Sequence, residues 1–123
     1  MNKLDQLREY TDVVADTGDI EAIAQFKPVD ATTNPSLLLK AASLDQYQEL
    51  IDNSANWAKS LELPDEEKLS VLADHYAVQI GCEILKLVPG RVSTEVDARL
   101  SFDTEATVNR ARRLVALYED AGI

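Results

Sequence analysis

The chain has 123 residues, 46% of them hydrophobic and 28% charged, which is typical of one globular domain with a hydrophobic core. Lys and Arg number 12 against 22 Asp and Glu, so the formal net charge is −10. A field of this sign repels nucleic acid and anionic membrane, and the weak basic cluster at Arg110, Arg112 and Arg113 does not reverse it, so we expect neither as a partner.

The cysteine content and the hydropathy pattern indicate where the protein works. Cys82 is the only cysteine, which excludes an internal disulfide and favours a reducing compartment. No apolar run approaches the length of a membrane span, and the polar first residues lack a signal-peptide core. We therefore expect a cytoplasmic protein.

The first quarter of the chain predicts a short helix followed by a strand–helix unit. The helix covers residues 3–10, and a brief apolar strand at 13–15 runs into Asp16. Asp19 or Gly18 then caps a helix over 20–26.

A second strand–helix unit follows. Residues 30–33 form a short β-compatible run, Asn34 is a good N-cap, and Pro35 suits the first helical position. Ser43 and Gln46 make a capping box for another helix. The apolar face of that helix consists of Tyr47, Leu50, Ile51, Ala55 and Ala58.

A long helix begins near Pro64 and stops by Pro89 and Gly90. Its apolar positions follow the i, i+3, i+4, i+7 spacing: they are Leu69, Leu72, Ala73, Tyr76, Ala77, Ile80 and Ile84. A strand over 92–96 comes next, and a last helix starts at Asp103 or Thr104 and ends at Gly122. The apolar face of this helix contains Val108, Ala111, Val115 and Tyr118.

Three strand–helix units in succession predict an α/β fold with parallel strands and right-handed crossovers. The chain ends at Ala121-Gly122-Ile123, where a helix-to-strand loop would lead into a further strand. We therefore expect this chain to be a piece of a larger protein.

Polar residues recur where each predicted strand ends. Asp16, Asn34 and Glu95 all occupy this kind of position, and in parallel α/β folds that edge is where sites are built. Simpler explanations stay open: Asn34 as a helix cap, Asp16 as a turn residue, and Glu95 as part of a strand end in solvent. Their joint occurrence favours a polar site.

The other chemically capable residues have structural explanations. His75, the only histidine, has no acid–nucleophile partners in the sequence and is expected to be a surface or packing residue of the long helix. Cys82 is expected to be a small buried side chain. The sequence has no metal-ligand cluster, P-loop or Gly-rich dinucleotide fingerprint.

Three segments carry a specific resemblance: Asp16-Thr17-Gly18-Asp19, the run from Asp30 to Ser36 that includes Ala-Thr-Thr-Asn-Pro-Ser, and the run from Ile84 to Ser101 that includes Ser-Thr-Glu-Val-Asp. In this order they closely resemble the N-terminal part of transaldolase of the classical bacterial and eukaryotic type. The resemblance covers the whole chain.

The resemblance implies that residues 1–123 form the N-terminal helix and the first three βα units of a (β/α)₈ TIM barrel. It also implies transfer of a dihydroxyacetone unit from sedoheptulose 7-phosphate to glyceraldehyde 3-phosphate in the non-oxidative pentose phosphate pathway. In this family a lysine forms a Schiff base with the ketose, and no metal or organic cofactor is used.

The resemblance also assigns roles to single residues. Asp16 matches the general acid/base for the hydroxyl next to the breaking bond, and Glu95 matches an acid that works through a water. Asn34 matches a residue that binds the dihydroxyacetone moiety, with Thr33 beside it. We expect the two carboxylates to lie in a partly desolvated opening.

The chain departs from the family pattern in one respect. The Schiff-base lysine of the family lies on the next strand, beyond residue 123, and Lys86 falls near a helix end, where we do not expect a nucleophile. Two hypotheses follow. The chain is either part of a transaldolase and inactive alone, or a non-catalytic truncated barrel that forms a homodimer or otherwise self-associates through an unpaired strand edge.

Overall fold

Three short parallel strands form the only sheet in the computed structural model, which describes residues 1–123. The strands are β1 (Val14–Asp16), β2 (Asp30–Thr32) and β3 (Val92–Ser93), in the order β1-β2-β3. Asp16 pairs with Thr32, and Thr32 pairs with Ser93. The carboxyl ends of the three strands therefore lie at one edge of the sheet, and the predicted α/β arrangement with parallel strands is confirmed.

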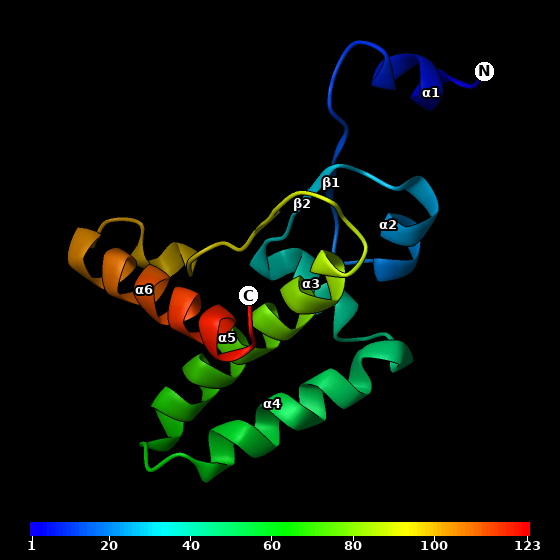
Figure 1. The fold of residues 1–123 in the computed structure, drawn as a ribbon. Coiled ribbons are helices and arrows are strands. Elements are labelled where there is room, and N and C mark those ends of the chain that lie inside the picture. The colour runs from blue at the N-terminus through cyan, green and yellow to red at the C-terminus, as the bar shows by residue number, and fades with distance from the viewer.

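Helices precede, connect and follow the strands. They are α1 (Lys3–Arg8), α2 (Ile20–Phe26), α3 (Pro35–Ala41), α4 (Gln48–Ser60), α5 (Asp65–Leu85) and α6 (Thr104–Asp120), with 3₁₀ turns η1 (Asp45–Tyr47) and η2 (Ala98–Leu100). Figure 1 shows α4 and α5 as two long neighbouring helices, α6 against α5, and α1 apart from the rest at the N-terminal end. No helix is both long and apolar enough to cross a bilayer.

The core lies between the sheet, the short helices and the C-terminal half of α5. Ile80 and Ile84 of α5 are completely buried. Burying aliphatic side chains of this size contributes about 1.5–3 kcal/mol each. The full buried cluster consists of Ile23, Ala31, Ala41, Tyr47, Tyr76, Ile80, Ile84 and Val88.

The predicted apolar face of α5 is only partly right. Tyr76, Ala77, Ile80 and Ile84 are buried as predicted, whereas Leu69 is 69% exposed. The buried residues of α5 also occupy other faces, with Val71, Asp74, Val78 and Gly81 among them. The reason is that α5 is covered by α4 on one side and α6 on another, so no single stripe describes its packing.

Two local predictions are wrong. Ser43 caps no helix, because its hydroxyl donates to the Lys40 carbonyl at 2.7 Å, and α4 begins at Gln48 without a side-chain cap. β3 is also shorter than the predicted strand 92–96, because the last ladder bond runs from the Thr33 amide to the Ser93 carbonyl. Beyond Thr33, the segment that follows β2 enters α3, so residues 94–96 have no strand to pair with.

Three helix caps are confirmed. The side chains of Asp19, Asn34 and Asp103 accept hydrogen bonds from backbone amides in the first turns of α2, α3 and α6 at 3.1, 3.0 and 2.9 Å. Gly122 follows α6 with φ of +86°, as expected for a C-terminal glycine. Lys27 ends α2 in the same left-handed region, with φ of +47°.

Candidate functional site

Asp16 is the last residue of β1, and its side chain is exposed. One carboxylate oxygen, Oδ1, accepts a hydrogen bond of 2.9 Å from the Thr32 hydroxyl on β2. Oδ2 has no partner within the chain. The register of the sheet brings these two side chains together, because Asp16 and Thr32 are paired residues of neighbouring parallel strands. Thr32 was not among the site residues predicted from the sequence.

Thr33 and Asn34 follow β2 and differ in exposure. Thr33 is 2% exposed, and its hydroxyl lies 3.4 Å from the Ser93 carbonyl oxygen. Asn34 is half-buried, and its Oδ1 caps α3. The Asn34 side-chain nitrogen has no partner within the chain, so the cap occupies only one end of the amide. Both explanations of Asn34, helix cap and binding residue, are compatible with this geometry.

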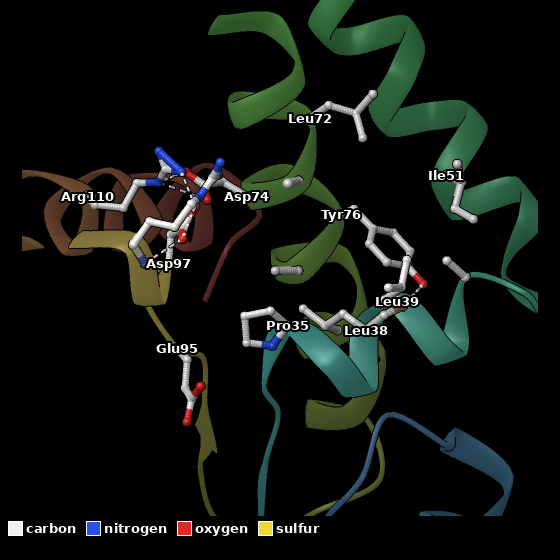
Figure 2. Close-up of a pocket in the computed structure, with 14 residues that line it drawn as sticks. Pro35, Leu38, Leu39, Ile51, Leu72, Asp74, Tyr76, Glu95, Asp97 and Arg110 are labelled. Carbon is white, nitrogen blue, oxygen red and sulfur yellow. Dashed lines mark hydrogen bonds and ion pairs between the residues drawn. The ribbon is translucent and has the colours of Figure 1, made fainter. Parts of the chain in front are cut away.

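Glu95 lies two residues beyond β3, is exposed, and makes no hydrogen bond or ion pair within the chain. It lines one end of a pocket of about 480 Å³ between α3, α4, α5 and residues 95–99. Figure 2 shows its carboxylate apart from the cluster that Asp74, Asp97 and Arg110 form at the same end of the pocket. Apolar side chains such as Leu38, Leu72 and Tyr76 make up most of the remaining wall.

The four residues predicted from the sequence therefore share one edge of the sheet, and no hydrogen bond joins their side chains. Glu95 lines the pocket, whereas Asp16, Thr33 and Asn34 do not. The expected partial desolvation of the two carboxylates is absent within residues 1–123, since Asp16 and Glu95 are both exposed. No three His, Cys, Asp or Glu side chains are grouped so that they could hold a metal ion.

Hydrogen bonds from Arg99 hold the carboxylate of Asp97, two residues after Glu95. The Arg99 side chain donates to both carboxylate oxygens of Asp97, with its Nη2 at 2.5 Å from Oδ2, and the Arg99 amide donates at 2.9 Å. These bonds, with a smaller contribution from Arg110 at 3.8 Å, lower the pKa of Asp97 to about 2.

A buried ion cluster joins α5 to α6 and was missed by the sequence analysis. Asp74, 8% exposed, accepts hydrogen bonds from Nε of Arg110 at 3.1 Å and from Nε of Arg113 at 2.8 Å. Both guanidinium groups also donate to the Ser70 hydroxyl, at 2.6 and 3.2 Å. Two of the three arginines of the weak basic cluster are therefore paired internally.

The turn after Asp16 is fixed by a tyrosine from a distant helix. Tyr47 is 2% exposed, its hydroxyl donates to the Gly18 carbonyl at 2.9 Å, and it accepts from the Ile20 amide at 2.8 Å. Tyr47 therefore satisfies backbone groups on both sides of the α2 cap, Asp19. The apolar spacing of the sequence identified Tyr47 as a core residue but gave no signal for this polar contact.

The remaining singled-out residues lie away from the sheet edge. His75 stacks on Trp57 with ring centroids 4.4 Å apart, and its Nδ1 is 2.8 Å from the Ser54 hydroxyl, which confirms its packing role. Cys82 is half-buried, and burial raises the pKa of its thiol. Lys86 caps the C-terminal end of α5 and pairs with Glu83 at 2.6 Å, as expected for a helix-end lysine.

Comparison with known proteins identifies the family of this chain. A family model described as Transaldolase/Fructose-6-phosphate aldolase matches residues 13–123. The transaldolase of Cellvibrio japonicus is 63% identical over 122 residues, which are 99% of this chain and 38% of the relative. Transaldolases of Shewanella baltica OS155 and Shewanella sp. ANA-3 are 59% and 58% identical with the same coverage. The chain thus spans 38% of the length of these curated relatives. Residues 1–123 belong to the transaldolase/fructose-6-phosphate aldolase family.

Proposed function

We propose that this chain is part of a transaldolase, which moves a dihydroxyacetone unit from sedoheptulose 7-phosphate to glyceraldehyde 3-phosphate through a Schiff base. The observation that supports this most is the position of Asp16, Asn34 and Glu95 at or just after the carboxyl ends of three neighbouring parallel strands. The names of the relatives support the same activity.

The proposed reaction gives each residue a separate task. A lysine outside residues 1–123 attacks the ketose carbonyl and expels water, and Glu95 moves the protons of this step through a water. The imine then accepts the electron pair of the breaking C–C bond, while Asp16 takes the proton of the neighbouring hydroxyl. The aldehyde product leaves, and the same steps run in reverse on the acceptor aldehyde. The free amide nitrogen of Asn34 donates to the dihydroxyacetone oxygen.

We propose further that residues 1–123 alone are inactive. All of the lysines lie on helices or at helix ends, and none is in a strand: they are Lys3, Lys27, Lys40, Lys59, Lys68 and Lys86. A Schiff-base nucleophile must reach the sheet edge at which Asp16 and Glu95 lie, and no lysine of residues 1–123 is in a strand or directly after one.

Borohydride reduction in the presence of fructose 6-phosphate, followed by intact-mass measurement, tests both statements. It is applied to residues 1–123 and to a completed chain, in which residues 1–123 are joined to the part of the Cellvibrio japonicus transaldolase that lies beyond the matched region. We expect no adduct on the 123-residue chain, but one adduct and transaldolase activity on the completed chain.

The Cellvibrio japonicus enzyme itself is the control for the assay. A completed chain that is folded by circular dichroism but forms no adduct would contradict the proposed function. An adduct on the 123-residue chain that disappears in Lys86→Arg would contradict its inactivity and would identify the nucleophile.

A second candidate activity is self-association of the 123-residue chain. β1 and β3 each pair with β2 alone, so both edges of the sheet are unpaired. Large apolar side chains are also exposed, with Leu39 at 76% and Val14 of β1 at 49%. Open edges beside apolar surface favour pairing with a second copy. Sedimentation velocity over a hundredfold concentration range tests this, and a single monomeric species throughout would contradict it.

A further inference from the structure

We propose that Thr32 is a positioning residue for Asp16: its hydroxyl holds one carboxylate oxygen in place, so that the other oxygen is free to exchange a proton with substrate. This inference rests on the proposed transaldolase function and deepens it, since it concerns the same sheet edge. Nothing in the residue pattern separates Thr32 from its neighbour Thr33, so the assignment depends on the three-dimensional contact.

The contact is built into the register of the sheet. Asp16 and Thr32 are the last residues of β1 and β2, and they are paired in the parallel ladder. Their side chains therefore emerge on the same face, and the hydroxyl oxygen lies 2.9 Å from Oδ1. A backbone bond of 3.2 Å from the Thr17 amide to the Thr32 carbonyl ties the same two strand ends together. The hydroxyl thus has a rigid base from which to hold the carboxylate.

The bond limits how the Asp16 carboxylate can move. An exposed aspartate can occupy three staggered χ1 positions, and its carboxylate rotates broadly at χ2. A threonine hydroxyl has one proton to donate, and here it is donated to Oδ1. Oδ2 is then directed away from Thr32, without any competing donor in the chain. A general base needs this kind of placement, because a displacement of about 1 Å can reduce the rate roughly 100-fold.

The neighbouring threonine cannot take over this task. Successive residues of an extended chain point to opposite faces, and the Thr33 hydroxyl accordingly lies against the Ser93 carbonyl in the interior. The alternative explanation of the Thr32 bond is that it only stabilises the pairing of β1 with β2, as cross-strand threonine contacts do. A measurement that separates placement of Asp16 from stability distinguishes these two explanations.

The test uses the completed chain and two substitutions at one position. Thr32→Val keeps the shape and β-branching of threonine but removes the hydroxyl, whereas Thr32→Ser keeps the hydroxyl. Thr107→Val is the matched control, because it removes a hydroxyl that donates at 2.7 Å to the Leu100 carbonyl in the η2–α6 region. For each variant, kcat, KM for fructose 6-phosphate, the yield of the borohydride-trapped adduct and Tm are measured.

We expect Thr32→Val to lower kcat roughly 10- to 100-fold, as for the loss of a hydrogen bond to a charged group, with KM within twofold. Its trapped-adduct yield should be unchanged, because Schiff-base formation precedes the step that uses Asp16. Thr32→Ser should keep kcat within about threefold, and Thr107→Val should leave it unchanged.

Three results would overturn the inference. They are a kcat of Thr32→Val within twofold of the unsubstituted completed chain, an equal loss in Thr32→Ser, or a kcat loss in Thr107→Val that matches the loss in Thr32→Val. The activity of the unsubstituted completed chain distinguishes a failure of the proposed function from a failure of the inference about Thr32. If it is inactive, the proposed function fails and this inference fails with it, whereas an active chain with an unaffected Thr32→Val variant refutes the inference alone.

Discussion

The ring of Tyr118 on α6 occupies the space directly over Gly81 on α5, so that a methyl group on Gly81 would lie 1.9 Å from the tyrosine hydroxyl oxygen. That hydroxyl is also 2.6 Å from the Thr94 hydroxyl, just beyond β3. One close helix–helix contact therefore holds the last helix and also the segment that leads to Glu95. Burial raises the pKa of Tyr118, so this contact contains a neutral phenol at physiological pH.

Gly81→Ala is expected to destabilise the protein by about 1–3 kcal/mol, because the tyrosine ring must move out of a packed contact. Urea unfolding followed by circular dichroism measures the loss. Gly18→Ala is the matched control, since a methyl group there would meet its nearest atoms at 3.4 Å or more, an ordinary contact distance. Equal stability of Gly81→Ala and Gly18→Ala would show that α6 does not pack on α5 in this way.

Substitution of Lys27 by glycine is expected to raise stability, in contrast to Gly81→Ala. Its φ of +47° places an ordinary side chain in the left-handed region, where glycine is favoured. Lys27→Gly should therefore stabilise the chain by up to about 1 kcal/mol, seen as a higher urea midpoint. Lys40→Gly, the same substitution inside α3, should destabilise it by about 0.5–1 kcal/mol. A decrease of the midpoint in both variants would contradict the backbone conformation of Lys27.

A substitution of Asp74 tests whether the ion cluster between α5 and α6 stabilises the fold. Asp74→Asn removes the carboxylate that pairs with Arg110 and Arg113, whose side chains are 14% and 38% exposed, and it leaves Arg110 with only the more distant Asp97 carboxylate at 3.8 Å. Loss of one partner of a fully buried pair costs about 3–5 kcal/mol. The partial exposure of Arg113 reduces this cost, so we expect a loss of about 2–3 kcal/mol and a clearly lower urea midpoint. Asp120→Asn, at the exposed end of α6, is the control and should change stability by less than about 0.5 kcal/mol. A similar, small effect of the two substitutions would show that the cluster is not formed.

Features formed by residues close together in the sequence could be predicted from it, whereas contacts between distant residues could not. The caps at Asp19, Asn34 and Asp103 involve neighbours three residues away, so the local pattern was sufficient to predict them. The parallel sheet followed from the succession of strands and helices. The bond from Tyr47 to Gly18 spans 29 residues, and no local pattern encodes it.

Local patterns also failed where long-range packing decides the conformation. The capping box at Ser43 and Gln46 was not formed: the Ser43 hydroxyl donates to the Lys40 carbonyl, and residues 45–47 form a 3₁₀ turn that buries Tyr47. Of two adjacent threonines the sequence analysis selected Thr33. The site role of Thr33 stays a prediction. The register with β1 places the hydroxyl of Thr32, which the sequence did not single out, on the Asp16 carboxylate, and register is a property of two strands together.

The lowered pKa of His75 predicts how the stability of the folded chain to urea depends on pH. Burial against Trp57 lowers the pKa of His75 below its usual value of 6.5, so below that pH the unfolded chain binds a proton that the folded chain resists. The contribution of His75 is therefore fully present above pH 6.5 and decreases as the pH falls towards the lowered folded-state pKa. Urea midpoints measured between pH 7.5 and pH 5.5 should fall less steeply in His75→Gln than in the unsubstituted chain. Equal slopes would show that His75 is not buried as described.

Asp16 and Glu95 act at different steps of the proposed reaction, and variants of the completed chain separate them. Asp16→Asn leaves imine formation intact but removes the group that takes the hydroxyl proton, so borohydride should still trap fructose 6-phosphate while transfer falls at least about 100-fold. Glu95→Gln should instead slow formation of the trapped adduct, because its carboxylate serves the water and proton exchanges of the imine steps. Glu21→Gln, an exposed acid on α2, is the control for the loss of one negative charge. Loss of trapping in Asp16→Asn with normal trapping in Glu95→Gln would reverse the two assignments, and the site would have to be rebuilt with Glu95 at the breaking bond.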